Sequence, residues 1–395
     1  MSGKRFHVLV VFGTRPEAIK LAPVIHELRR FPDQFKTSVC ISAQHRHLLE
    51  PILRWFRIPV HYDLDVMRPN QELCELSARI LDRFHEVLSP HRPDMVLVQG
   101  DTTTAMVASL AAFYHRVPVG HVEAGLRTLD RFSPFPEEIN RRLVSHLADV
   151  HFAPTSWARI NLLKERIPRK RIFVTGNTVV DAFLETRARV LRRPPALAQL
   201  KGFKLEARKL IVVTAHRREN FGPGLTSICR GLQRLASQRD DIEIVFPVHP
   251  NPNVQSVVRP MLAGIDRIHL IDPLEYPQFV WLLSSAYLGL TDSGGIQEEM
   301  PSLRRPVLVM RKNTERPEGL QAGVCKLVGT SADVIVRTVG QLLDDQQAYA
   351  RFTRRRNPFG DGRAAQRIVT TLKHILTSAP GSNSRRVRAL GKPPI

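Results

Sequence analysis

This sequence has few cysteines and no long apolar run, and both features narrow the class of protein. Its 395 residues include four cysteines, none in CxxC spacing, so neither a zinc site nor a redox dithiol is indicated. No apolar run approaches the roughly 20 residues of a membrane span. The short apolar run near the amino terminus ends in a charged loop, unlike a signal peptide. We therefore expect a soluble, cytoplasmic protein with reduced thiols.

Acidic residues are also scarce relative to basic ones. The 58 Lys and Arg residues outnumber the 37 Asp and Glu residues, which gives a net charge of +21. Such a charge fits nucleic acid, an anionic membrane or a phosphorylated substrate, and does not choose among them. The arginine runs at 354–356 and 385–386 have no interleaved aromatics and no nucleic-acid motif, which favours a solvated basic surface. We expect no nucleic-acid partner and no stable membrane association.

Two common cofactor signatures are missing as well. No GxGxxG segment follows a predicted strand, so a nicotinamide site is not supported. The 15 histidines are scattered and form no HExxH pair, so a metal site has little support. The sequence therefore predicts a protein without a metal or a cofactor.

Short β-branched runs alternate with amphipathic segments along the whole chain. Continuous apolar strands separated by helices are typical of parallel sheets covered on both faces. We therefore expect an α/β fold with two Rossmann-like, doubly wound domains in tandem. The predicted strands are 7–12, 37–42, 94–99, 117–122, 151–154, 171–175, 209–214, 242–248, 267–271, 287–291 and 306–310.

The segment 187–208 breaks this alternation with charged residues and the pair Pro194–Pro195. It predicts an amino-terminal domain over 1–186 and a carboxy-terminal domain over 187–363. A helix is expected over 364–377. The basic tail 378–395 is rich in Gly, Ser and Pro, which indicates disorder.

The loop after the first strand reads GTRPE (13–17) and leads into a helix that carries Lys20. Glycine permits a tight turn, and the first turn of a helix offers free N–H groups to an anion. Arg15 can add a bidentate contact to a phosphate. An ordinary strand-to-helix turn with a solvated arginine is the alternative.

Three carboxylates follow strands or open a helix in the first half. Asp101 follows strand 94–99, Glu123 follows strand 117–122, and Glu137 opens a helix. Asp101 as a helix N-cap and Glu137 as a common helix start are the alternatives. Because parallel strands end at one edge of a sheet, the three acids together indicate general acid/base chemistry.

The second half places His216, His249 and the segment Ser293–Gly295 directly after strands. Ser-Gly-Gly at a helix start is suited to a pyrophosphate, because small residues let backbone N–H groups approach its oxygens. Glu299, one turn later, is placed to accept both hydroxyls of a ribose. Ser293 as a nucleophile is the alternative, but no GxSxG segment surrounds it.

Together these segments resemble the non-hydrolysing UDP-N-acetylglucosamine 2-epimerase family. The resemblance covers almost the whole chain in order, and the basic tail falls outside it. Its motifs are GTRPEAIKLAPVI (13–25), AQH (43–45), QGDTTTAMVASLAAFYHRVPVGHVEAGLRT (99–128), SPFPEEINRR (133–142), VTGNTVVDA (174–182), AHRREN (215–220), PVHPN (247–251), DSGGIQEEMPSL (292–303), TERPE (314–318) and NPFGDGRAAQRI (357–368).

The resemblance implies a GT-B-like architecture with the active site in the cleft between the two domains. The carboxy-terminal helix is then expected to cross back to the first domain. The implied reaction interconverts UDP-N-acetylglucosamine and UDP-N-acetylmannosamine for bacterial surface polysaccharide synthesis, without a redox cofactor. We expect a homodimer. A hydrolysing epimerase and a GT-B glycosyltransferase are the alternatives.

The resemblance also implies roles for individual residues, matched position by position. The implied catalytic residues are Asp101, Glu123, Glu137 and His216. The implied substrate contacts are Arg15 and Lys20 near the diphosphate, Leu274 and Phe279 beside the uracil, and Ser293, Gly294, Gly295 and Glu299 around the UDP. The implied site for a second, activating substrate molecule includes Gln44, Arg217 and His249.

Overall fold

A computed structural model describes residues 5–43, 46–68, 71–196 and 208–377 of the chain. The chain divides into two compact units, one formed by residues up to 182 together with those from 360 onward, the other by 183–359. Gln44 and the basic tail 378–395, for which the sequence analysis makes predictions, lie outside the described residues. None of the helices within the described ranges has the length and apolar character that a membrane-spanning helix requires.

The first unit is built on a parallel sheet of seven strands in the order β3-β2-β1-β4-β5-β6-β7. The central strands are buried along their whole length, as the continuous apolar runs predict. The strands are β1 (Phe6–Phe12), β2 (Phe35–Ile41), β3 (Tyr62–Asp63), β4 (Met95–Gln99), β5 (Val119–Val122), β6 (Val150–Ala153) and β7 (Ile172–Val174).

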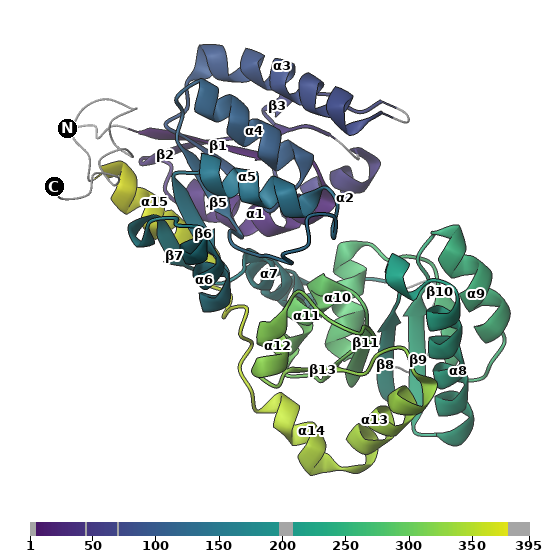
Figure 1. The fold of residues 1–395 in the computed structure, drawn as a ribbon. Coiled ribbons are helices and arrows are strands. Elements are labelled where there is room, and N and C mark those ends of the chain that lie inside the picture. The colour runs from purple at the N-terminus through teal and green to yellow at the C-terminus, as the bar shows by residue number, and fades with distance from the viewer. Residues whose placement is uncertain (1–4, 44–45, 69–70, 197–207, 378–395) are drawn as a thin grey trace. The chain divides into compact units, whose positions relative to one another are not determined.

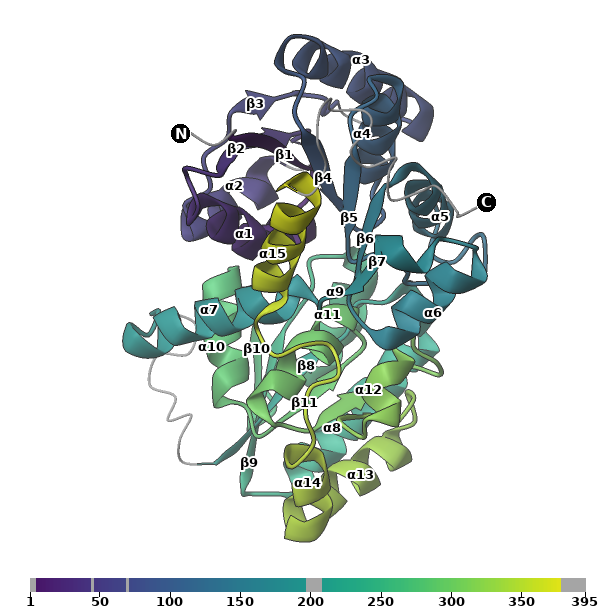
Figure 2. The ribbon, with the colours of Figure 1, turned by 90° about the vertical axis from the view of Figure 1, so that its left-hand side faces the viewer.

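Helices cover both faces of this sheet. Helices α3, α4 and α5 lie side by side on one face, and α1, α2 and α15 lie together on the other (Figures 1 and 2). The helices of this unit are α1 (Arg15–Arg29), α2 (Arg46–Phe56), α3 (Leu73–His91), α4 (Thr103–Tyr114), α5 (Glu137–Leu147), α6 (Ser156–Lys164) and α15 (Ala364–Thr377). Helix α7 (Thr178–Arg192) begins in this unit and ends in the second.

The second unit repeats this scheme on a parallel sheet of six strands in the order β10-β9-β8-β11-β12-β13. Its strands are β8 (Lys209–Thr214), β9 (Ile242–Pro247), β10 (Ile268–Ile271), β11 (Leu288–Thr291), β12 (Val307–Val309) and β13 (Cys325–Leu327). Its helices are α8 (Pro223–Gln238), α9 (Pro252–Leu262), α10 (Tyr276–Ser285), α11 (Gly294–Glu299), α12 (Pro317–Gln321), α13 (Ala332–Asp344) and α14 (Gln346–Thr353). The predicted α/β architecture with two doubly wound sheets is confirmed.

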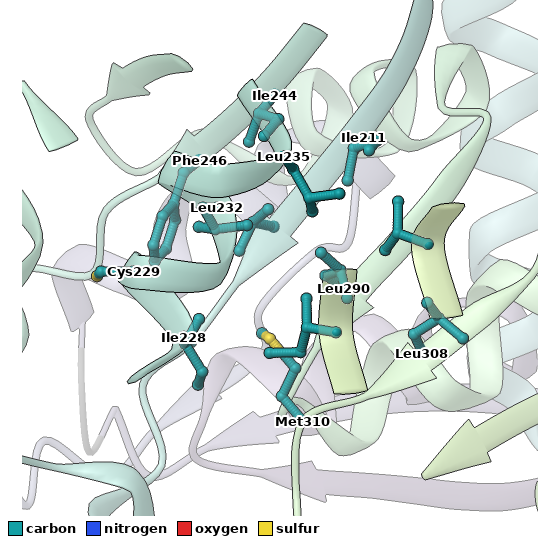
Figure 3. Close-up of a cluster of buried hydrophobic side chains, with 14 of the residues drawn as sticks. Ile211, Ile228, Cys229, Leu232, Leu235, Ile244, Phe246, Leu290, Leu308 and Met310 are labelled. Atoms are coloured by element: carbon teal, nitrogen blue, oxygen red, sulfur yellow. The ribbon is translucent and has the colours of Figure 1, made fainter. Parts of the chain in front are cut away.

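The main core of the second unit lies between its sheet and helices α8, α9 and α13. Leu232 and Leu235 of α8 pack onto Ile211, Ile244 and Phe246 of the strands (Figure 3). These side chains are almost fully buried. At roughly 1.5–3 kcal/mol for each large apolar side chain, this layer holds the helices on the sheet and fixes where the loops after the strands emerge.

The expected boundary segment 187–208 begins inside α7, which runs to Arg192 before Pro194–Pro195. The helix buries Phe183, Thr186 and Val190 along one face. Arg187 and Arg189 are half-buried and Arg192 is exposed, so the beginning of the charged stretch, up to residue 192, belongs to an amphipathic helix. The two compact units divide within this helix, between residues 182 and 183.

Helix α15 packs on α1 of the first unit. Its first turn is held by Asp181, whose carboxylate accepts hydrogen bonds from the backbone N–H groups of Ala364 (3.2 Å) and Ala365 (2.8 Å). Burial raises the pKa of Asp181 to about 6, against the opposing effect of these two donors. The capping carboxylate therefore comes from α7, far away in sequence.

Two buried histidines lie side by side on β5 and β6. His121 Nε2 hydrogen-bonds the carbonyl oxygen of Gly100 (2.8 Å), whereas neither ring nitrogen of His151 has a partner among the described residues. Burial is the main cause that lowers the pKa of His121 to about 4 and that of His151 to about 3. Both rings are therefore neutral at neutral pH.

These histidines make the stability of the first unit depend on pH. An unfolded histidine titrates near 6.5, so below about 6.5 the unfolded chain binds more protons and the folded state loses stability as pH falls. His151→Leu removes one such group and leaves no donor stranded. We expect it to reduce the loss in unfolding free energy between about pH 7 and about pH 5 by about 2 kcal/mol, measured by urea titration.

His146, on the exposed side of α5, gives the matched control. His146→Leu is expected to leave the pH dependence of unfolding as it is in the wild type. An identical pH dependence in the His151 variant and the wild type would show that His151 does not carry this effect.

Candidate active site

The candidate residues gather at one point in each sheet. In the first sheet β1 and β4 are neighbours although they are not consecutive in sequence, and in the second β8 and β11 are. At such a switch point the loops after the two strands diverge, and ligands of open α/β sheets bind there. GTRPE follows β1, Asp101 follows β4, His216 follows β8 and Ser293 follows β11.

The GTRPE loop is held by its own glutamate. Glu17 accepts hydrogen bonds from the backbone N–H groups of Gly13 (3.0 Å) and Thr14 (2.8 Å) and from the Thr102 hydroxyl (2.7 Å). A Cβ atom at Gly13 would lie 2.1 Å from Ser42 Oγ, so the packing requires glycine here. Burial raises the pKa of the Glu17 carboxyl. This buried carboxylate joins the loops after β1 and β4.

Sequence reasoning did not single out Glu17. The signal was present, because Thr14 and Glu17 have the spacing of a capping box and both of its hydrogen bonds form. Arg15 follows at the first position of α1, with its side chain half-buried.

Glu123 stands directly after β5 with a left-handed backbone (φ 65°) and 7% exposure. Lys20 Nζ donates to both of its carboxylate oxygens, at 2.6 and 2.7 Å. The side-chain amides of Gln99 and Asn177 (2.8 Å for the latter) also donate to it. Lys20 is therefore paired with a candidate catalytic acid.

Asp101 does not cap α4. The cap is its neighbour Thr102, whose hydroxyl accepts from Ala105 N (3.0 Å). The Asp101 carboxylate instead accepts from two nitrogens of Arg141, and its side chain stays 25% exposed. The alternative that Asp101 is the N-cap of α4 is thus excluded, and its carboxylate caps no N–H group of this helix.

Glu137 and Glu138 open α5 and differ in their surroundings. Glu138 is fully buried and accepts from the backbone N–H groups of Thr128 (3.0 Å) and Leu129 (3.2 Å). These and other donors lower its pKa despite its burial. Glu137 is half-buried, and its Oε2 atom is shielded from solvent without a partner among the described residues. Glu138 therefore anchors the loop, while Glu137 keeps an uncommitted oxygen.

In the second unit Asp292 organises the loop after β8. This fully buried carboxylate accepts from the backbone N–H groups of His216 (2.9 Å) and Arg217 (2.9 Å) and from the Asn220 amide (3.0 Å). Asp292 stands in the motif DSGGIQEEMPSL, but the sequence alone does not predict a role for it. Its place between a strand and Ser-Gly-Gly was the available signal.

His216 stacks on His249, with ring centroids 5.2 Å apart. Its Nδ1 atom lies 3.6 Å from Asp292 Oδ1. Burial is the main cause that lowers the pKa of His216, against the opposing effect of Asp292, and nearby His249 and Arg217 act in the same direction as burial. The ring is therefore neutral at neutral pH, and an arriving anion would favour its protonated form.

The Ser293–Gly295 turn starts α11, and Gly294 lies against the guanidinium of Arg316. A Cβ atom at Gly294 would lie 2.5 Å from Arg316 Cζ. The Arg316 guanidinium is fixed by Glu298 (2.7 Å) and Glu315 (2.8 Å). This cation at the turn was missed from sequence, because the contact depends on where the later TERPE loop folds back.

The remaining candidate residues of the second unit lie as follows. Glu299 is 7% exposed, with Tyr276 Oη 3.5 Å from its Oε1 atom. Leu274 is buried just before α10, and Phe279 within α10 is half-buried. Arg217 points toward Glu315 (3.5 Å), and His249 is exposed. Within the described ranges no group of three or more His, Cys, Asp or Glu residues is arranged to hold a metal ion.

The fold and the charged loops at both switch points define a GT-B-like enzyme. At the level of fold alone, the chain is similar to a glycosyltransferase of kitacinnamycin, which is 11% identical with a TM-score of 0.63 over 94% of this chain and 99% of the other.

The chain belongs to the UDP-N-acetylglucosamine 2-epimerase family. The family model of that description matches residues 26–373. The chain is 55% identical to UDP-N-acetylglucosamine 2-epimerase of Yersinia pestis over 93% of this chain and 98% of the relative. It is 52% identical to the enzyme of the same name from Escherichia coli strain K12, over 93% of this chain and 98% of the relative. The structure of UDP-GlcNAc 2-epimerase from Neisseria meningitidis bound to UDP-GlcNAc is 47% identical, with a TM-score of 0.86, over 93% of this chain and 99% of the other.

Proposed function

We propose that this chain is an isomerase that inverts C2 of UDP-N-acetylglucosamine to give UDP-N-acetylmannosamine, reversibly and for surface polysaccharide synthesis. The observation that carries the proposal is the set of three carboxylates at the carboxyl edge of the first sheet, in a chain of this family. Their different partners support distinct roles. Glu123 accepts hydrogen bonds from Lys20, Gln99 and Asn177. Asp101 pairs with Arg141, and Glu137 has one oxygen without a partner among the described residues.

The chemistry explains why acids and cations are both needed. The C2 proton of the sugar has no adjacent carbonyl, so direct deprotonation at neutral pH is too slow. Breaking the C1–O bond sends its electron pair to the diphosphate and builds positive charge at C1, which acidifies C2–H. A carboxylate then takes the proton, and a C1=C2 double bond forms, giving UDP and 2-acetamidoglucal. Protonation of C2 from the other face, with return of UDP to C1, gives the epimer.

We assign the groups accordingly. Asp101, Glu123 and Glu137 form the acid/base set, with Lys20 holding Glu123 in place. Arg15 and His216 bind the diphosphate, and the departing negative charge favours the protonated form of His216. Ser293, Gly294, Gly295 and Glu299 bind UDP, with Leu274 and Phe279 beside the uracil.

We also propose that Arg217, His249 and Gln44 take part in activation by a second substrate molecule. The stacked rings of exposed His249 and half-buried His216 support this, because they join a surface residue to the catalytic group. We further propose a homodimer. Exposed Phe113 (58%) and Tyr114 (64%) at the end of α4 support an interface on the first unit.

Incubation of the purified protein with UDP-N-acetylglucosamine alone tests the proposal, with products followed by NMR. The expected product is UDP-N-acetylmannosamine in equilibrium with the substrate. Release of free N-acetylmannosamine would instead identify a hydrolysing epimerase. Absence of turnover until a sugar acceptor is added would identify a glycosyltransferase.

A further inference from the structure

Two consecutive residues of α5 reach the loop that carries Asp101. Arg141 donates from Nε (3.0 Å) and from Nη2 to the same carboxylate oxygen, Oδ2 of Asp101. Asn140 donates from its side-chain amide to the backbone carbonyl oxygen of Asp101 (3.0 Å). The Arg141 side chain is only 9% exposed. Asp101 is therefore fixed in both its backbone and its side chain by one turn of α5.

Glu137 lies at the start of the same helix, and a second set of hydrogen bonds anchors this end of α5. Arg141 Nη1 lies 3.3 Å from Oε2 of buried Glu138, which in turn binds the backbone after β5. His121 holds the Gly100 carbonyl next to Asp101 (2.8 Å). The guanidinium thus joins the loop after β4, the loop after β5 and the start of α5.

The proposed reaction requires two proton-transfer groups at a defined distance from each other. One group must remove the C2 proton, and another must return a proton to the opposite face of the ring. Their separation across the sugar has to match its thickness. The link between Asp101 and the helix that carries Glu137 is the structural element that sets such a separation.

We propose that Arg141 is a positioning residue that fixes Asp101 relative to Glu137, and this inference rests on the function proposed above. Both N–H groups bind Oδ2, which leaves Oδ1 without a protein partner among the described residues. That oxygen is the one presented to the substrate. Arg141 acts through Asp101 and needs no contact with the sugar.

The chain offers a matched control in the next residue. Arg142 binds the same Glu138 carboxylate, at 2.8 and 3.1 Å, but forms no hydrogen bond to Asp101 within the described part of the chain. Both Arg141→Gln and Arg142→Gln therefore disturb Glu138, and only the former releases Asp101.

A misplacement of about 1 Å at a reacting group can cost about 10²-fold in rate. We expect Arg141→Gln to lower kcat by about 10²-fold with KM and UDP affinity nearly unchanged. Arg141→Lys, which keeps the charge but loses the planar fork, is expected to recover part of the rate. More UDP and 2-acetamidoglucal are expected to escape per epimer formed, because the second proton transfer is misaligned. Arg142→Gln should keep wild-type kcat and product ratio.

A double-mutant cycle with Asp101→Asn completes the test. If Arg141 acts through Asp101, Arg141→Gln adds little to the loss already caused by Asp101→Asn. If the fold-losses in kcat from the two substitutions multiply in the double variant, the inference is overturned. It is also overturned if Arg141→Gln lowers kcat but leaves the ratio of glucal to epimer unchanged. Thermal unfolding of each variant separates misfolding from misplacement, and Arg141→Lys supplies the comparison if Arg141→Gln is unfolded. A wild-type protein that makes no epimer would refute the proposed function itself, not the positioning role alone.

Discussion

Replacing Glu137 with glutamine is expected to lower the turnover of UDP-N-acetylglucosamine by about 10²–10⁴-fold, the range for loss of a general acid or base. The amide keeps the shape of the side chain but cannot exchange a proton in the same way. Because Glu137 Oε2 has no partner among the described residues, its replacement breaks no hydrogen bond to that atom. We therefore expect thermal unfolding and the affinity for UDP, measured by calorimetry, to stay close to wild type.

Glu86→Gln is the control, since Glu86 is exposed on α3 and only 3.5 Å from Arg83 across one helical turn. Its turnover should equal that of the wild type. A folded Glu137→Gln protein that turns over at the wild-type rate would remove Glu137 from the acid/base set.

Asp292→Ala is expected to have the largest effect on the second unit. It leaves two backbone N–H groups and the Asn220 amide without their buried acceptor. At about 1–3 kcal/mol for each stranded buried donor, a loss of about 3 kcal/mol in unfolding free energy is the expected minimum. Because the loop with His216 and Arg217 loses its anchor, kcat is expected to fall as well. Urea unfolding and steady-state rates measure the two effects.

Asp272→Ala provides the comparison, because the Asp272 side chain is 70% exposed and pairs with Arg259 at the surface. Exposed pairs of this kind contribute about 0–1 kcal/mol. An Asp292→Ala protein as stable as Asp272→Ala would mean that the buried carboxylate does not organise this loop.

The sequence was sufficient to predict the long central strands and their helices, because continuous apolar runs can be satisfied only by burial on both faces. The strands that it missed are β3 (Tyr62–Asp63) and β13 (Cys325–Leu327), two and three residues long. Both lie at the edge of a sheet and pair on one side only. Such a strand needs no apolar run, so its sequence carries little signal.

For the candidate site, the alternation of strands and helices predicted where the polar loops fall but not what their side chains bind. The resemblance predicts Lys20 near the diphosphate, and this stays a prediction. The structure adds hydrogen bonds from its ammonium to Glu123, 103 residues away in sequence, which no local pattern indicates. Arg316 over Gly294 and Arg141 on Asp101 are similar cases. Each contact joins segments that follow different strands of a sheet, and the local pattern of residues does not encode which segments meet.

The most direct test of the elimination mechanism is epimerisation in D2O with no added nicotinamide, followed by proton NMR. Removal of the C2 proton by a protein carboxylate that exchanges with solvent predicts UDP-N-acetylmannosamine that carries deuterium at C2. The recovered UDP-N-acetylglucosamine should gain deuterium at C2 as the reaction reverses. Product that retains the original C2 hydrogen through complete turnover would contradict proton transfer by Asp101, Glu123 and Glu137.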